Sequence, residues 1–224
     1  METPIISLNN VTISHDDGPL LSNINLSITP GEFVYLIGRS GAGKTSLLRT
    51  LYADHDIDQG EAQVCGFDLT HLKHRQIPLL RRKIGIVFQN FRLLKDRNVF
   101  DNLAFVLQAT GWKKSEMEAQ ITKVLTSVGI ADKAMSSIHH LSEGEQQRVG
   151  IARAIINSPS LILADEPTGN LDPATSSDIM ELLLNINREM GTTMLISTHD
   201  FMMIDKFQSR VLVCENGTLT DPQQ

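Results

Sequence analysis

Apolar and polar positions are arranged differently in successive parts of the chain. Residues 5–13 form a strand-like run, and residues 21–28 alternate between apolar and polar side chains. Such alternation is typical of antiparallel strands with one face in solvent. Residues 33–37 are continuously apolar, which predicts a strand buried on both faces. Turn signals at residues 16–19 and 30–31 separate these runs.

The pattern then changes to a helical one and returns to strands near the end. Between about residues 98 and 157, apolar side chains recur every three or four positions. A helix over residues 173–190 begins with Pro173 and ends before Gly191. Further strands are predicted at 61–67, 84–88, 161–164, 193–197 and 211–214. We therefore expect an α/β fold with a mainly parallel core, an antiparallel β subdomain at the front and a helical insertion.

Composition and charge narrow the class of protein. The chain has 224 residues, of which 41% are hydrophobic and 21% charged, as in ordinary globular proteins. The formal net charge of -6 argues weakly against a nucleic-acid partner, because nucleic-acid binders usually carry a basic excess. The start of the chain does not resemble a signal peptide, and no apolar run reaches the roughly 20 residues that cross a bilayer. We expect a cytosolic chain that reaches a membrane only through a partner.

Two cysteines are present, and neither indicates a metal site. Cys65 and Cys214 lie far apart, each in an apolar, strand-like stretch. Two cysteines alone do not make a metal site. We expect both to be reduced thiols in the protein core.

A phosphate-binding loop follows the apolar run at 33–37. The G-x-x-x-x-G-K-[ST] pattern is matched in full by Gly38, Arg39, Ser40, Gly41, Ala42, Gly43, Lys44 and Thr45, and Ser46 follows in the helix. Backbone N–H groups of such a loop surround phosphates, and the helix N-terminus adds partial positive charge. We expect Lys44 to reach the β- and γ-phosphates and the Thr45 hydroxyl to bind Mg²⁺. A glycine-rich turn with an incidental lysine is the alternative, which the strand–loop–helix order makes a poor one.

Two carboxylates end the apolar run at 161–164. Asp165 is placed at the carboxyl end of the strand to hold Mg²⁺, directly or through water. Glu166, one residue later, is placed to polarise an attacking water molecule. Both could instead be solvated acids at a strand end. Because they accompany a phosphate-binding loop, we predict a nucleoside triphosphatase site.

Four more stretches are similar to motifs of the ATP-binding cassette (ABC) family and occur along the chain in the order that is usual for that family. Residues 141–145, Leu-Ser-Glu-Gly-Glu, resemble the family signature Leu-Ser-Gly-Gly-Gln; Gln89 matches the Q-loop glutamine, Leu171-Asp172 the D-loop and His199 the switch histidine. The resemblance covers nearly the whole chain. It implies that residues 1–224 form an ABC nucleotide-binding domain with a P-loop NTPase (RecA-like) core, in which about residues 90–157 form a helical subdomain.

The family resemblance also implies a mechanism. Two copies would enclose two ATP molecules, with Ser142 and the Gly144 amide binding the γ-phosphate from the opposite copy. Glu166, His199 and Gln89 would be catalytic, and Thr45, Gln89 and Asp165 would hold Mg²⁺. Simpler interpretations exist: Gln89 and His199 could be surface side chains, Asp172 an ordinary helix N-cap, and Ser142 with Glu145 a capping box.

Within the family, the chain is most similar to a cell-division group, on residues 87–94, 96–99, 141–149 and 164–173. Groups that act in lipoprotein release and macrolide export share residues 165–172 and are the alternative. The cell-division resemblance implies an ATPase on the inner face of the cell membrane, bound to an integral membrane subunit. That subunit would transmit a signal to cell-wall hydrolases outside the membrane rather than pump a substrate.

Two residues and one short apolar segment lead to further predictions. His15 stands near the position where the family stacks an aromatic ring on adenine, and its smaller apolar area puts adenine selectivity in question. Glu143 replaces a signature glycine and brings a negative charge near the γ-phosphate. The apolar residues within 91–94 either dock the membrane partner or fill the helical subdomain's own core.

Overall fold

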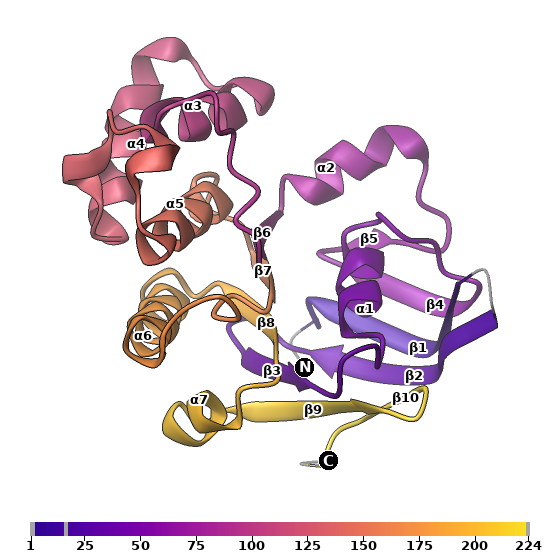
Figure 1. Cartoon of the computed structure of the whole chain (residues 1–224). Coiled ribbons are helices and arrows are strands. Elements are labelled where there is room, and N and C mark those ends of the chain that lie inside the picture. The colour runs from indigo at the N-terminus through magenta and orange to yellow at the C-terminus, as the bar shows by residue number, and fades with distance from the viewer. Residues whose placement is uncertain (1–2, 16–17, 223–224) are drawn as a thin grey trace.

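The computed structural model describes residues 3–15 and 18–222 (Figure 1). An antiparallel four-stranded sheet has the order β2-β1-β4-β5 and contains β1 (Ile6–His15), β2 (Gly18–Ile28), β4 (Gln59–Val64) and β5 (Phe67–Asp68). In β2 the inward side chains Leu21, Ile24, Leu26 and Ile28 are buried, whereas the residues between them are more exposed. The alternation in the sequence therefore produces the predicted sheet with one apolar face.

A six-stranded sheet with the order β10-β9-β3-β8-β7-β6 forms the centre of the fold. Its strands are β3 (Phe33–Ile37), β6 (Ile84–Phe88), β7 (Leu161–Asp165), β8 (Thr193–Thr198), β9 (Arg210–Glu215) and β10 (Thr218–Thr220). Strands β9, β3, β8, β7 and β6 run parallel, and β10 returns antiparallel to β9. The carboxyl ends of the parallel strands meet at one edge of the sheet, where α/β folds bind ligands.

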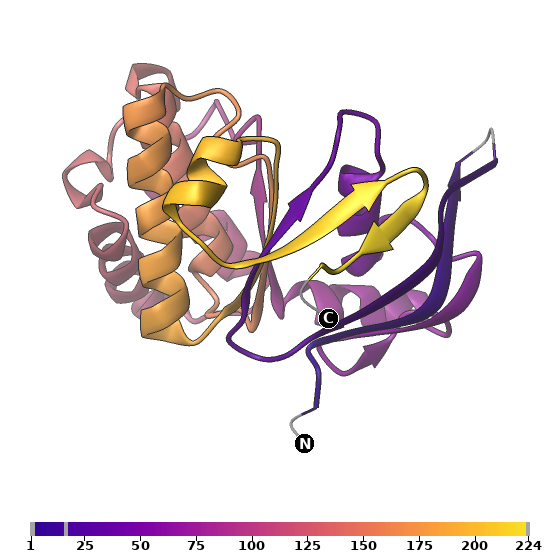
Figure 2. The same ribbon diagram turned by 90° about the horizontal axis from the view of Figure 1, so that it is seen from below.

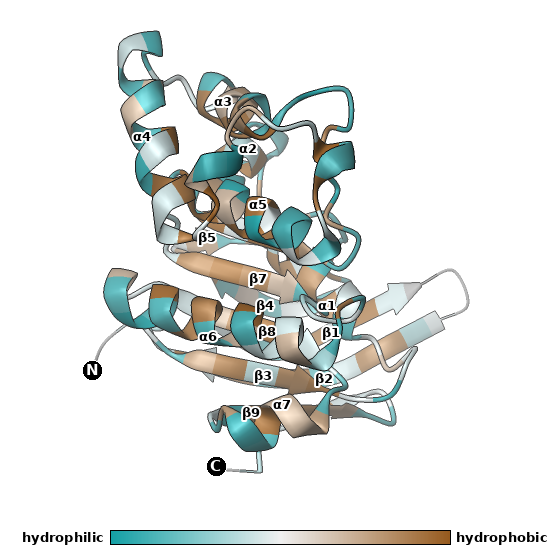
Figure 3. Cartoon of the chain, turned by 60° about the vertical axis from the view of Figure 1, so that its left-hand side comes forward, coloured by the Kyte–Doolittle hydropathy of each residue, from teal (hydrophilic) through white to brown (hydrophobic). Residues whose placement is uncertain are grey.

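The two faces of this sheet pack into two hydrophobic clusters. In β3, Tyr35 belongs to the cluster with the long helices, whereas Val34 and Leu36 belong to the cluster with the antiparallel sheet. Successive side chains of a strand point to opposite faces, so a continuously apolar strand fills both clusters. In Figure 3, β3 and β7 are largely apolar and α6 crosses in front of β8.

Helices cover the sheet and extend from it. The structure has α1 (Lys44–Leu51), α2 (Ile77–Arg81), α3 (Val99–Ala109), α4 (Lys114–Ser127), α5 (Glu143–Ile155), α6 (Pro173–Met190) and α7 (Phe201–Lys206). Helices α3 to α5 lie together, away from β1 and β2 (Figure 1). In Figure 2 the β9–β10 hairpin lies between α6 and α7 on one side and the long β1 and β2 strands on the other. The Ser22 amide donates to the Gly217 carbonyl at 2.8 Å and ties the hairpin to β2.

The sequence pattern differs from the structure at a few boundaries. The strand expected at 61–67 is interrupted, because Cys65 and Gly66 adopt left-handed backbone angles (φ 51° and 80°) and form a turn. The short helices α2 and α7 have five and six residues, too few for helical periodicity to reveal them. Of the turn expected at 16–19, residues 16 and 17 lie outside the described residues.

Two observations bear on the expectations from composition. Cys65 and Cys214 are both buried and form no disulfide, as predicted for core thiols. In the part of the chain that the structure describes, no helix has both the length and the apolar character required to cross a bilayer.

Candidate functional site

The phosphate-binding loop connects β3 to α1 and depends on glycine at its tightest points. Gly43 caps α1 in the left-handed region with φ 99°, a conformation that side chains disfavour. A Cβ atom at Gly38 would lie 2.3 Å from the Cys214 carbonyl oxygen of β9, so a larger residue would displace the loop. The Cys214 thiol donates a hydrogen bond to the Ala42 carbonyl at 2.8 Å. Strand β9 therefore supports the loop from beneath.

Lys44 is buried at the first position of α1 and turns back across the loop. Its ammonium group donates to the carbonyl oxygens of Gly38 at 2.8 Å and Arg39 at 3.1 Å. The same nitrogen lies 4.0 Å from Glu166 Oε1. The loop backbone therefore fixes a positive charge at the centre of the site, where a polyphosphate would be attracted.

Asp165 ends β7 beside the start of α1. Its Oδ1 accepts hydrogen bonds from the Thr45 hydroxyl at 3.2 Å and from the Ser197 hydroxyl of β8 at 2.7 Å. The Glu166 amide also donates to Ser197 Oγ, at 3.0 Å. Ser197 was not singled out from the sequence, although its position at the end of a buried strand is a signal that could have identified it.

Glu166 lies between two nitrogen groups. Its Oε1 is 3.2 Å from His199 Nδ1, which follows the end of β8, and 4.0 Å from Lys44 Nζ. Glu166 has φ 45°, a left-handed conformation that is uncommon for a residue with a side chain and is concentrated at functional sites. The side chain of His199 is 64% exposed, so it faces outward as well as toward the carboxylate.

Gln89 follows β6 and is held in place by the loop after β7. Its carbonyl accepts a hydrogen bond from Asn170 Nδ2 at 3.1 Å, and the same nitrogen lies 3.2 Å from Asn90 Oδ1. A Cβ atom at Gly169 would lie 3.0 Å from Gln89 Nε2, so the two loops are in close contact. Asn170 is a second residue that sequence reasoning missed.

These groups surround one cavity of about 520 Å³, which is called the phosphate cavity below. It is lined by Leu20, Ser40, Gly41, Gly43, Lys44, Thr45, Ser46, Gln89, Asp165 and Glu166. The structure thus brings together most residues predicted from the phosphate loop, the two-acid strand end and the Q-loop. His199 contacts the cavity through Glu166.

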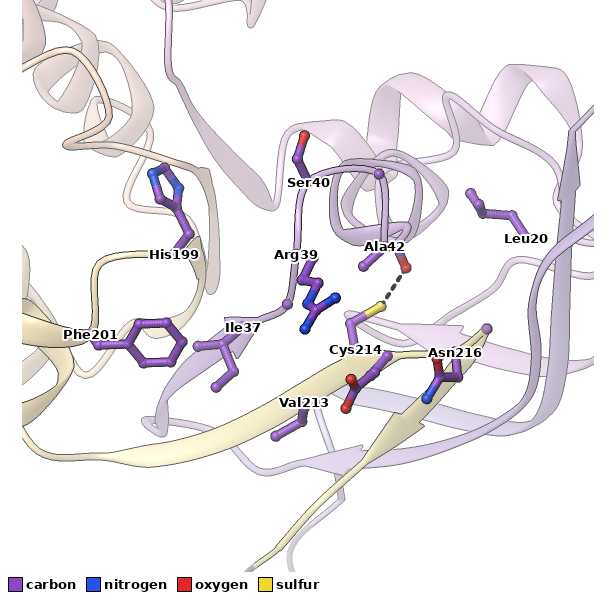
Figure 4. A pocket seen from close by; sticks show the side chains of 14 residues that line it. Leu20, Ile37, Arg39, Ser40, Ala42, His199, Phe201, Val213, Cys214 and Asn216 are labelled. Carbon is purple, nitrogen blue, oxygen red and sulfur yellow. Dashed lines mark hydrogen bonds between the residues drawn. The ribbon is translucent and has the colours of Figure 1, made fainter.

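A neighbouring cavity of about 770 Å³ lies across the loop (Figure 4). Arg39, Ser40 and Ala42 border it from the loop, and His199 and Phe201 border it from the end of β8 and the start of α7. A third cavity continues past His199 toward Leu171 and Pro173. The described surface around His199 is therefore hollowed on two sides, with exposed apolar side chains between.

Other predicted residues lie outside the phosphate cavity of the same chain. Ser142 caps α5 and forms the predicted capping box with Glu145, whose amide lies 3.3 Å from Ser142 Oγ. A hydrogen bond from the Ser142 amide holds the pKa of Glu145 below its usual range. Asp172 caps α6 and accepts from the amides of Ala174 and Thr175. The side chain of His15 lies outside the described residues.

Leu93 packs against the hydrophobic cluster of the long helices. This contact corresponds to the interpretation in which the apolar residues within 91–94 fill the helical region's own core. Phe91 and Leu94 are half-buried.

A phosphate-binding loop, a buried lysine and two acids at the carboxyl edge of a parallel sheet define a P-loop nucleoside triphosphatase. Comparison with known proteins identifies the family: a model described as ABC transporter matches residues 21–169. The chain is 46% identical over 222 residues to the cell division ATP-binding protein FtsE of Mycobacterium tuberculosis, covering 98% of this chain and 96% of that protein. It is 43% identical over 214 residues to FtsE of Streptococcus pneumoniae, covering 95% and 93%.

Solved structures agree with this assignment. The chain is similar to cbiO1 from Clostridium perfringens, part of the ABC transporter complex cbiONQ, with a TM-score of 0.90, 28% identity, and coverage of 98% of this chain and 88% of that one. It is also similar to the ATP-binding cassette MJ0796 in a dimeric post-hydrolysis state bound to ADP and Pi, with a TM-score of 0.85, 32% identity, and coverage of 96% and 98%. The chain belongs to the ABC transporter family and is an ATP-hydrolysing cassette with the ABC ATPase fold.

Proposed function

We propose that the chain is the ATPase subunit of a membrane complex of the cell-division type. The observation that carries the proposal is the convergence of Lys44, Asp165 and Glu166 at one cavity, with His199 beside Glu166, in a chain 43–46% identical to FtsE proteins. In this proposal residues 1–224 form one nucleotide-binding domain, with a helical subdomain over about residues 90–157.

Each residue of the cavity has a proposed role. Loop amides from Gly38 to Ser46 and the Lys44 ammonium bind the phosphates of ATP. Glu166 accepts a proton from the attacking water, and His199 and Gln89 sense the γ-phosphate. His199 Nδ1 lies 3.2 Å from the Glu166 carboxylate and so orients this general base.

The cavity also suits Mg²⁺. The Thr45 hydroxyl and the Asp165 carboxylate lie 3.2 Å apart and present the hard oxygen donors that this cation prefers, with the Gln89 side chain as a third candidate. Mg²⁺ bound by these residues would neutralise charge on the phosphates. Asp165 is kept in position by Ser197, so the oxygen donors are pre-arranged.

We also propose that two copies close on ATP; the similar cassette MJ0796 is dimeric, and in one structure its dimer is in a post-hydrolysis state bound to ADP and Pi. Ser142, which caps α5, and Gly144, in its first turn, lie outside the phosphate cavity of their own chain, which is consistent with a role toward the nucleotide of a second copy. A helix N-terminus with its first amides available favours an anion such as the γ-phosphate.

The membrane partner is proposed to be an FtsX-like subunit through which ATP hydrolysis controls cell-wall hydrolases. In this arrangement the ATPase lies on the cytoplasmic face of the membrane. A groove of about 430 Å³ between α2 and the helices α3 and α5 suits such a contact. Three arginines, Arg81, Arg82 and Arg153, line it, and none of its lining residues is acidic. A partner segment with apolar and acidic side chains would complement this groove.

Co-purification tests the partner. The tagged chain is extracted from the native membrane with detergent, and the integral membrane protein that accompanies it is identified by mass spectrometry. We expect an FtsX-like protein with the parent and about tenfold less with Arg82→Glu, because reversing one charge in the groove places like charges opposite each other. Arg188→Glu, on the exposed side of α6, is the matched control. Recovery of a lipoprotein-release or export subunit would overturn the cell-division assignment.

A further inference from the structure

Helix α5 contacts two loops of the candidate site besides carrying Ser142 at its N-terminus. Near its carboxyl end, Arg153 donates hydrogen bonds from its two terminal nitrogens to the carbonyl oxygens of Phe91, at 2.7 Å, and Arg92. Closer to its start, Gln147 donates to the Pro167 carbonyl at 2.6 Å. Pro167 directly follows Glu166, and Phe91 lies two residues after Gln89. The same helix therefore contacts the chain directly after Glu166 and shortly after Gln89.

The carbonyls that Arg153 binds belong to an unusual backbone segment. Phe91 and Arg92 both have left-handed angles, with φ of 54° and 49°, although neither is glycine. Two consecutive residues of this kind persist only when surrounding contacts over-determine them. The planar guanidinium binds two acceptors in a fixed geometry, which a flexible ammonium group cannot reproduce.

Arg153 is the link between the left-handed pair and α5, whereas Asn102 of α3 holds the chain two residues further on, through hydrogen bonds of 2.8 and 3.1 Å with the Leu94 backbone. The Arg92 guanidinium lies 4.4 Å from the centre of the ring of Phe88, the last residue of β6. Asn170, in the loop after β7, binds the Gln89 carbonyl. The segment is thus held between the loop after β7 and helix α5. Burial, and to a lesser degree the nearby Arg92 charge, lower the pKa of Arg153, a half-buried guanidinium at the edge of a groove.

We propose that Arg153 is a positioning residue that fixes the left-handed pair Phe91 and Arg92 and thereby sets the place of Gln89 at the phosphate cavity. The inference rests on the proposed role of Gln89. Because Arg153 also lines the groove proposed for the membrane partner, a segment bound there would act on Gln89 through this guanidinium. Arg153 itself does not line the phosphate cavity, so its effect is indirect.

The test uses the full chain and a compensating substitution. Arg153→Lys keeps the charge but loses the two-pronged geometry. We expect its kcat to fall about tenfold and the Mg²⁺ concentration for half-maximal ATPase activity to rise, with little change in KM for ATP. Arg92→Gly in this background should recover most of the kcat, because glycine adopts a left-handed angle without steric cost. Arg92→Ala removes the same guanidinium but keeps the strain and should recover none.

Hydrogen exchange of the peptide over residues 89–94 gives a readout that does not depend on catalysis. Faster exchange there in Arg153→Lys, reversed by Arg92→Gly and not by Arg92→Ala, supports the positioning role. Equal exchange in parent and Arg153→Lys overturns it, and so does equal rescue by glycine and alanine. If Gln89→Ala hydrolyses ATP at the parent rate, the proposed role of Gln89 fails, whereas the exchange result still decides whether Arg153 holds the loop.

Discussion

Glu166 Oε1 lies 3.2 Å from Nδ1 of His199, and the two residues come from the ends of adjacent parallel strands, β7 and β8. The pairing follows from topology, since the strands are neighbours and their carboxyl ends share one edge of the sheet. The Ser197 hydroxyl reinforces it, because it accepts from the Glu166 amide and donates to Asp165. In the proposed mechanism, a carboxylate held in this way would be positioned to orient water before ATP binds.

The first prediction concerns this carboxylate. Glu166→Gln should retain ATP binding, while kcat falls at least about a hundredfold, the scale of losing a general base. The Lys44 contact to the loop carbonyls does not involve Glu166, so the phosphate cavity should persist. Isothermal titration and phosphate release measure the two effects. Lys44→Ala is the contrasting variant, expected to lose nucleotide affinity instead. Near-parent turnover in Glu166→Gln would contradict the assignment.

The sequence predicted the sheet core and the phosphate loop because each has a strong local signal. Residues 33–37 and 161–164 are short, fully apolar runs, and a glycine-rich loop follows the first of them. Ser197 and Asn170 were missed because their roles come from contacts at sequence separations of 32 and 81. The periodicity of apolar residues along the sequence gives no information on such long-range contacts. The left-handed pair Phe91 and Arg92 was equally invisible, since neither residue type favours that conformation.

A second prediction concerns the exposed apolar residues after His199. Phe201 is 64% exposed and Met202 is 73% exposed, and both line the cavity that runs from His199 to Leu171. If a second copy covers this face when ATP binds, burying one such side chain contributes about 1.5–3 kcal/mol. In the Glu166→Gln background, Phe201→Ser should therefore raise the dimer dissociation constant with ATP about tenfold or more. Analytical ultracentrifugation measures this constant.

Phe105→Ser is the control for that experiment. Phe105 is 46% exposed on α3, away from the cavities around His199. It should leave dimerisation unchanged. Equal dimerisation of Phe201→Ser and parent would show that the second copy does not cover Phe201.

The third prediction tests how adenine is held. His15 stands near the position where the family places an aromatic ring, at the end of β1. Stacking of aromatic rings contributes about 1 kcal/mol, so His15→Tyr should tighten ATP binding several-fold and His15→Ala should weaken it. Titration of a fluorescent ATP analogue, competed with ATP and with GTP, gives both affinity and base selectivity. If neither variant changes the ATP dissociation constant, another group holds the base.

The last prediction concerns the acid at the signature position. Glu143 is the first residue of α5 and its side chain is exposed. Two opposing effects act there. A negative charge in the first turn of a helix is stabilising by roughly 0.3–1 kcal/mol, whereas the same charge repels a γ-phosphate that approaches the helix N-terminus. The adjacent Gly144 packs closely on α6, since a Cβ there would lie 2.6 Å from Thr175 Cγ2, so the start of α5 has little room to shift away.

Because the backbone at Gly144 is confined in this way, we expect repulsion to slow closure of the dimer and hence basal turnover. Glu143→Gln removes the charge and keeps helix-forming character, and Glu143→Gly restores the family's usual residue. Both should hydrolyse ATP a few-fold faster than the parent at low salt, without the membrane partner. The difference should shrink toward 1 M salt, where the screening length falls to about 3 Å. Both variants lose the charge, but only Glu143→Gly also loses helix propensity, about 0.5–1 kcal/mol. Thermal unfolding of the two variants therefore separates the loss of charge from the loss of helix propensity. Equal ATPase rates of parent and both variants at every salt concentration would leave Glu143 with a helix-terminal role alone.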